Sequence, residues 1–274
     1  MIHAAIELAS AGKSNPGGFR TEIVRGGYQW VIDRFRPAYE AGSRVLILHR
    51  PRGESYDGLT FMNLDSGKDL ERSPDARRIL DQEDWFLEQF AKEFPDAKVI
   101  AYFGSSKEPD LQGRIDRGDL RQFWDRYGAS FGPWINSPIV DLCFDHAGSL
   151  RPGDPHGMAI MLVDALLSQH GRTVYVEPQT QPWSVTAPLP YICTELWMGR
   201  WGDPSRPGTV WLEGNSVDEF PEWRDNYTEW ARFRLSQGHQ VAIGPEHIPA
   251  IVRALSTSHG PVGDSKTDLA KVGA

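Results

Sequence analysis

Carboxylate residues recur at the ends of short apolar runs in the second half of this chain, and they are the residues best suited to chemistry. The acids that close these runs are, in chain order, Asp145, Glu177, Glu195, Glu213 and Glu246. Each run has the length and composition of a buried β-strand. If the strands are parallel, their carboxyl ends meet at one face and the carboxylates share a pocket. The pattern predicts an enzyme with an acidic pocket.

A set of carboxylates in one pocket predicts acid–base chemistry. Neighbouring carboxylates repel one another, so the arrangement needs a function or a bound cation to justify it. One carboxyl group can protonate a glycosidic oxygen while a second acts as nucleophile or as base for water. A single strand-end acid is as often a helix cap or a salt-bridge partner, and the prediction therefore depends on the whole set.

Histidines and tryptophans near the strand ends would complete the pocket. Aromatic rings flank sugars in carbohydrate sites, and several tryptophans lie on or just beyond the acid-bearing runs. One histidine ends an earlier strand and another directly follows the first acid. The residues that we expect to bind the substrate are Glu177, Glu246, His49, His146, Trp183, Trp197 and Trp201.

The order of the predicted elements favours an α/β protein, a (β/α)8 barrel in a single domain. Eight strand-like runs alternate with mostly helical patterns, and strands four to eight end at the five acids in turn. An open doubly wound sheet is the alternative, but the loop AGKSNPGG after the first strand lacks its glycine spacing. Prolines and glycines after strands five and six predict reduced helices there. We expect the barrel to span 1–256 and a polar tail to span 257–274.

Alternation along the strands predicts which side chains face the barrel interior. Pairs expected to share the inner face are Cys143 with Asp145, Cys193 with Glu195, and Trp211 with Glu213. The two cysteines are too few for a disulfide framework and lie within apolar runs. We therefore expect both thiols to be reduced and buried.

Composition argues against several other classes of function. The net charge is −8 and no cluster of Lys and Arg stands out, which argues against a nucleic-acid partner. No run reaches the ~18 apolar residues of a membrane span, and the first residues lack the features of a secretory signal. We expect a soluble protein, cytoplasmic or part of a larger assembly, with no membrane partner and no cofactor. The oligomeric state is left open.

The combination of strand-end acids with tryptophans resembles the TIM-barrel glycoside hydrolases, in architecture over most of the chain and without a specific family motif. In the largest clan of these enzymes the acid/base follows strand four and the nucleophile follows strand seven, which would fall on Asp145 and Glu213. That clan ends strand four in Asn-Glu, whereas this chain has Asp145 and His146 there. Another group places a nucleophilic Asp after strand four and the acid after strand six, which would select Asp145 and Glu195.

The favoured hypothesis is thus a carbohydrate-active hydrolase with a carbohydrate substrate and no metal. A divalent-metal-dependent barrel enzyme, of the sugar isomerase or endonuclease kind, is an alternative that would use strand-end acids and histidines. Its signal is weak, because no tight ligand spacing such as His-Glu-x-x-His is present. A barrel that binds carbohydrate or forms an assembly without catalysis would have a similar sequence.

Overall fold

The structure is a computed structural model that describes eleven parts of the chain. These are residues 1–6, 18–49, 55–56, 59–60, 81–104, 132–145, 155–177, 188–194, 206, 208–212 and 226–257. A few residues inside the helices and strands, His49 and Asp145 among them, are described by their backbone alone.

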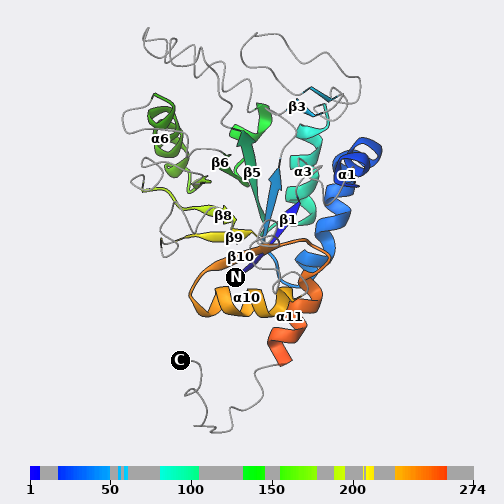
Figure 1. Cartoon of the computed structure of the whole chain (residues 1–274). Coiled ribbons are helices and arrows are strands. Elements are labelled where there is room, and N and C mark those ends of the chain that lie inside the picture. Colours follow the sequence, from blue (N-terminus) through cyan, green and yellow to red (C-terminus); the bar gives the residue numbers. More distant parts are fainter. Residues whose placement is uncertain are drawn as a thin grey trace.

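Eight parallel strands form the centre of the molecule (Figure 1). They are β1 (Ile2–Ile6), β2 (Val45–His49), β5 (Lys98–Gly104), β6 (Val140–Asp145), β7 (Val174–Val176), β8 (Ile192–Thr194), β9 (Val210–Leu212) and β10 (Gln240–Ile243). Their order in the sheet is β7-β6-β5-β2-β1-β10-β9-β8, which is the chain order read around a ring. A short antiparallel pair, β3 (Ser55–Tyr56) with β4 (Leu59–Thr60), lies apart from this sheet.

The two edge strands of the sheet meet and close it. Val176 of β7 forms a parallel bridge with Tyr191, directly before β8. The Val176 N–H donates to the carbonyl of Pro190 at 3.0 Å. Eight parallel strands closed in chain order make a (β/α)8 barrel in one domain, and the predicted fold class is confirmed. The two links expected to have reduced helices, 178–187 and 195–205, lie outside the described residues.

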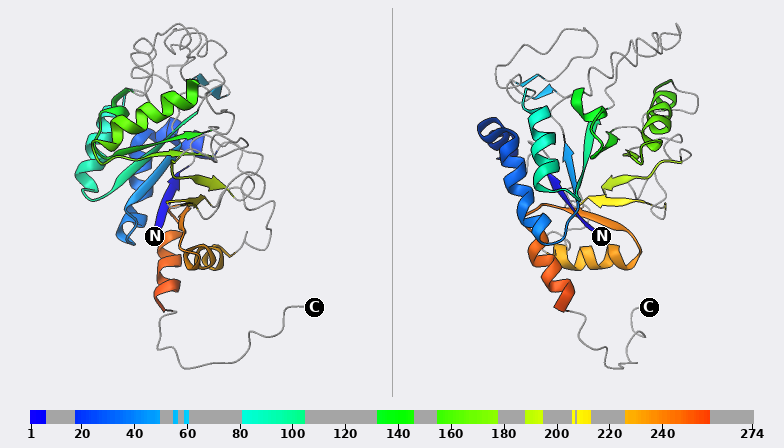
Figure 2. Two further views of the ribbon diagram at one scale, coloured as in Figure 1. Left: turned by 90° about the vertical axis from the view of Figure 1, so that its left-hand side faces the viewer. Right: turned by 180° about the vertical axis from the view of Figure 1, so that it is seen from behind.

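Helices lie on the outside of the strands (Figure 2). They are α1 (Gly18–Glu40), α3 (Glu83–Glu93), α6 (Pro155–Ser168), α10 (Tyr227–Ser236) and α11 (Ile248–Thr257), with a 3₁₀ turn η1 (Gly132–Ile135). None of these described helices is long and apolar enough to cross a membrane. Helix α11 ends at Thr257, the first residue of the polar tail expected at 257–274, and the rest of that tail lies outside the described residues.

An outer core fills the space between the strands and the helices. Helix α1 buries Tyr28, Ile32 and Phe35 at helical spacing, and α3 buries Phe86 and Phe90 against them. The Tyr28 and Phe86 rings stack with centroids 4.6 Å apart, and Phe35 stacks on Phe90 at 5.2 Å. Aromatic pairs of this kind contribute beyond their buried area. They hold α1 and α3 side by side, with α1 against β1 (Figure 1).

A separate inner core fills the barrel itself. Its fully buried members are Ile47, Ile100, Cys143, Ile192, Val210 and Ala242. Four of them, on β2, β6, β8 and β10, come from alternate strands of the ring, which is how side chains stack in layers inside such barrels. We call this set, Ile47, Cys143, Ile192 and Ala242, the floor layer. Each member is at most 1% exposed.

The inner and outer cores correct the predicted alternation on two strands. Cys143 faces the interior as expected, but Cys193 and Trp211 pack in the outer core, while Ile192 and Val210 face inward. The physical reason is that β8 and β9 are apolar on both faces, so the sequence carries no signal of which face is inside. Both cysteines are free thiols and buried, which confirms that part of the prediction.

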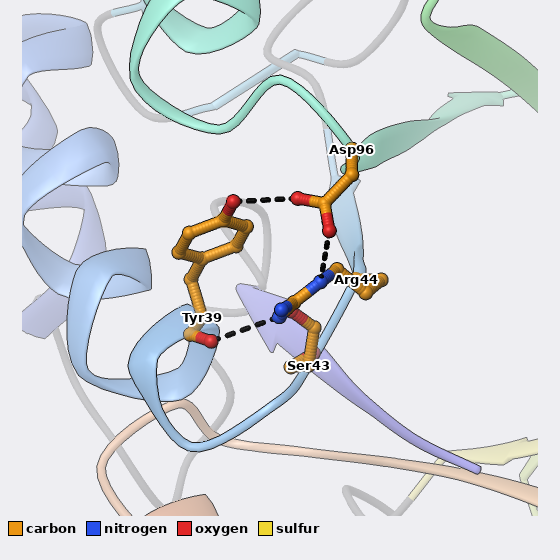
Figure 3. Close-up of polar contacts among 4 residues, drawn as sticks. All are labelled: Tyr39, Ser43, Arg44 and Asp96. Atoms are coloured by element: carbon orange, nitrogen blue, oxygen red, sulfur yellow. Dashed lines mark hydrogen bonds and ion pairs between the residues drawn. The ribbon is translucent and has the colours of Figure 1, made fainter.

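Polar contacts tie the outer helices to the amino end of the barrel (Figure 3). Tyr39, near the end of α1, donates its hydroxyl to Asp96 at 2.5 Å, and Arg44 donates Nε to the other Asp96 oxygen at 2.6 Å. Arg44 also donates to the Tyr39 carbonyl at 2.9 Å and lies over the Tyr39 ring at 4.4 Å. These exposed contacts place the link between α1 and β2 against the link between α3 and β5.

His3 is buried inside the amino end of the barrel. Its ring Nε2 donates to Gln240 Oε1 at 2.5 Å, and its Nδ1 has no hydrogen-bond partner in the part of the chain that the structure describes. Burial lowers the pKa of His3 to about 4, and the hydrogen bond to Gln240 only partly opposes that shift. The imidazole is therefore neutral in the folded protein at pH values where the unfolded chain would be protonated.

We expect the free energy of unfolding to fall as the pH drops from about 6.5 to about 4, because only the unfolded chain takes up the His3 proton in this range. The full effect is about 3 kcal/mol, and it stops growing below pH 4. Urea unfolding at a series of pH values measures it. A His3→Gln variant serves as the control and should lose this part of the pH dependence. The same slope in both proteins would contradict the assignment.

Candidate active site

The floor layer divides the barrel interior, so a ligand reaches the carboxyl half only from the carboxyl end. All four members are buried and packed against one another. Packing of this density leaves no passage for a substrate along the axis. The candidate site is therefore the space above the floor layer, where parallel strands present their carboxyl ends.

Three described residues occupy strand positions directly above the floor, and alternation along the strands turns each of them to the interior. Ala5 on β1 and Leu212 on β9 pack on the inner core and are only partly buried. Glu177 follows β7 and lies two positions after Tyr175, which also packs on the inner core. Glu177 is nevertheless only 7% exposed. We call the layer of strand positions occupied by Ala5, Glu177 and Leu212, with the solvent-accessible space beside Ala5 and Leu212, the mouth chamber.

Glu177 is fixed by the backbone ladder that joins β6 to β7. Phe144 pairs with Val176, and the Glu177 N–H donates to the Phe144 carbonyl at 3.0 Å, which extends the ladder past the end of β7. The next position on β6 is Asp145, which is also paired with Gly104 of β5. Asp145 and Glu177 thus occupy adjacent strand positions, with backbones about 5 Å apart.

The negative charge of Glu177 affects the pKa of a nearby thiol, that of Cys193. Burial raises the pKa of the Cys193 thiol well above its usual value, and the negative charge of Glu177 raises it further. The positive charge of Arg206 opposes this effect. Arg206 lies over the Tyr191 ring at 4.2 Å, so one cation stands within electrostatic range of the β7 and β8 strand ends.

Two other predicted site residues lie at the ends of strands. His49 closes β2, where its backbone pairs with Tyr102 of β5 at the carboxyl end of the barrel. Glu246 follows β10 but turns to the outside, because Arg34 of α1 donates to both of its carboxylate oxygens at 2.8 Å. The Glu246 side chain is 49% exposed. Its described partners are thus Arg34, on a helix outside the barrel, and the neighbouring His247, whose Nε2 lies 3.8 Å from Oε1.

The remaining predicted site residues lie outside the described residues: Glu195, Glu213, His146, Trp183, Trp197 and Trp201. The alternation argument that put Glu195 and Glu213 on the inner face depended on Cys193 and Trp211. Both of these face the outer core, so that argument no longer supports the two glutamates as partners of Asp145. Within the described residues, no group of three or more His, Cys, Asp or Glu side chains comes together as a metal site would require.

Sequence reasoning missed Ala5 and Leu212 as residues of the mouth chamber. Both belong to apolar strand runs, and a small or aliphatic residue in such a run is expected to be core. The one available signal was position, since both lie near the carboxyl ends of their strands.

Comparison with known proteins gave similarity only to solved structures. No family model matches the chain, and no curated protein matches it. The metallated homocysteine methyltransferase of Escherichia coli is 13% identical, covers 92% of this chain and 96% of its own, and has a TM-score of 0.39. The tryptophan synthase alpha chain of Legionella pneumophila subsp. pneumophila is 16% identical, with 94% and 84% covered and a TM-score of 0.40. A dihydropteroate synthase of Coxiella burnetii is 10% identical, with 94% and 91% covered and a TM-score of 0.38.

The predicted carbohydrate-active hydrolase is corrected by these findings. The three similar structures are a methyltransferase, a synthase subunit and a dihydropteroate synthase, and none of the three is a glycoside hydrolase. The resemblance to the TIM-barrel glycoside hydrolases is kept only for the barrel, which the strand order shows, and the predicted hydrolase activity is not retained. The carbohydrate substrate expected from that activity is given up with it.

Both native thiols should resist modification in the folded protein. Cys143 is 0% exposed in the floor layer and Cys193 is 1% exposed in the outer core, where its raised pKa also keeps it protonated. We expect Ellman's reagent to detect no rapidly reacting thiol in native protein and two in guanidinium. Rapid reaction of a native thiol would show that the floor layer or the outer core is open to solvent.

Proposed function

We propose that this protein is an enzyme that transfers protons to and from a small polar molecule bound in the mouth chamber, with Glu177 and Asp145 as its acid–base pair. The observation that supports this most directly is the ladder that sets buried Glu177 beside the Asp145 position. Residues 1–256 are proposed as the catalytic unit, with the tail 257–274 outside it.

Two carboxyl groups at adjacent strand positions can divide the work of acid and base. Interacting carboxyl groups lose their protons in two separate steps that belong to the pair. Between these steps one group holds a proton to donate while the other can accept one, as proton transfer at a carbon or oxygen atom requires. The apolar floor layer below the pair limits water and strengthens electrostatic interactions in the chamber.

The proposed reaction class is isomerisation, in which one carboxylate takes a proton from one atom of the substrate and the other carboxyl group gives a proton to another atom. A proton passing between the two carboxyl groups then restores the pair. Glu177, whose backbone is fixed beside β6 and which is only 7% exposed, is proposed as the base. Asp145, one strand away, would return the proton. His49, at the end of β2 on the same face of the barrel, is proposed as a further contact to the substrate.

Exchange of substrate protons with solvent gives a direct test. Wild-type protein in D₂O should incorporate deuterium into members of a panel of small hydroxy and carbonyl compounds, followed by NMR. Glu177→Gln should slow this exchange by about 10²–10⁴-fold, because it removes the base with little change in shape. The matched control Glu246→Gln changes the same residue type on the outside of the barrel, where it affects only the exposed contacts with Arg34 and His247. Equal rates in wild type and Glu177→Gln would contradict the proposal.

Coupling between the two carboxyl groups can be measured without a substrate. NMR titration of ¹³C-labelled carboxyl groups should show Glu177 and Asp145 losing protons as an interacting pair. Replacing Asp145 by Asn should then shift the titration of Glu177 by about one pH unit or more. A Glu177 titration that is unaffected by Asp145→Asn, with the fold intact by circular dichroism, would show that the two are not a pair.

A further inference from the structure

We propose that Ala5 is the residue that sets the size of the molecule admitted to the mouth chamber, because it forms the wall opposite Glu177. The strands β1 and β7 are the first and the fifth of eight in the closed ring, so they stand on opposite sides of the barrel. Ala5 faces the interior, where it packs on the inner core, while Ala4 and Ile6 pack in the outer core.

Ala5 and Glu177 also stand at the same height. Interior side chains of such barrels form layers of four, drawn from odd or from even strands in turn. The floor layer comes from the even strands of the ring, and Ala5, Glu177 and Leu212 come from its first, fifth and seventh strands. The register supports this placement, because Ala5 is paired with Ile47, a member of the floor layer, and β1 continues past it only to Ile6.

The two facing walls differ in length and in polarity. Ala5 contributes a single methyl group and Leu212 an aliphatic side chain, and both remain partly exposed, whereas Ala242 in the floor layer is fully buried. Glu177 on the other side contributes a long, ionisable side chain. Among the described residues, the chamber is apolar at β1 and, a quarter-turn away, at β9, and it is polar at β7, which suits a small molecule with an apolar part and a polar part. Calling this molecule a substrate rests on the proposed function. The size limit set by Ala5 does not depend on that function.

Cysteine labelling tests the chamber without any known ligand. Both native thiols are buried, so an Ala5→Cys variant carries a single new thiol in the mouth chamber. We expect methyl methanethiosulfonate to modify it in native protein. The matched control is Ala242→Cys, which faces the same interior one layer lower at 0% exposure and should stay unmodified until the protein unfolds. An unreactive thiol in folded Ala5→Cys overturns the proposal.

Charge selectivity tests whether Glu177 faces Ala5. A cationic methanethiosulfonate carrying an ethylammonium group should modify Ala5→Cys faster than an anionic one carrying an ethylsulfonate group. At low ionic strength we expect the ratio of the two rates to be roughly tenfold larger than the same ratio for free cysteine. Adding Glu177→Gln should remove most of this preference, whereas adding Glu246→Gln should leave it. A preference that Glu177→Gln does not change means that the two residues do not share a compartment, which also overturns the proposal.

A Leu212→Cys protein tests whether the size of the side chain at position 5 limits access to the mouth chamber. It also replaces Ala5→Cys as the labelling site if that variant does not fold. Its thiol should be labelled in native protein, and adding Ala5→Leu should abolish that labelling, because the larger side chain fills the chamber. Unchanged labelling would show that position 5 does not limit access. These outcomes are distinct from a failure of proton transfer: labelling reports the chamber whether or not any compound exchanges deuterium, and loss of exchange in Glu177→Gln is measured with Ala5 intact.

Discussion

The hydrogen bond from the Val176 N–H to the Pro190 carbonyl is the contact on which the architecture depends. With the bridge between Val176 and Tyr191 it joins β7 to β8, the two outermost strands of the sheet order. A closed sheet leaves no edge with unpaired backbone groups. Without this contact the same strands would form an open sheet, and β1 and β7 would lie in one layer, separated by β6, β5 and β2, without facing each other across an interior.

Closure creates two cores with different tasks. The outer core, rich in aromatic rings on α1 and α3, holds the helices on the barrel and supplies most of the buried apolar surface. The inner core is small, and its floor layer separates the polar amino end, with His3 and Gln240, from the carboxyl end. The buried carboxylate of Glu177 therefore belongs to the layer directly above an apolar floor. The proposed chemistry and the proposed size limit both follow from that position.

The sequence predicted the barrel and the strand ends of β6 and β7 well, because Asp145 and Glu177 close apolar runs flanked by clear loop signals. It failed on β8 and β9, where Cys193 and Trp211 are as apolar as their inward-facing neighbours. Both faces of those strands are buried, so alternation carries no information there. The orientation of Glu246 depends on Arg34, far away in the chain, and no local pattern encodes such a pair.

Amide hydrogen exchange at Val176 tests the closed barrel most directly. The Val176 N–H bonds across the closing seam to Pro190, while the Leu142 N–H bonds within the sheet, from β6 to Thr173 beside β7. A closed barrel predicts that the two amides are protected to a similar degree, since both open only when the barrel comes apart. Exchange of the Val176 amide at the rate of an unfolded chain, with Leu142 still protected, would show an open sheet and contradict the account.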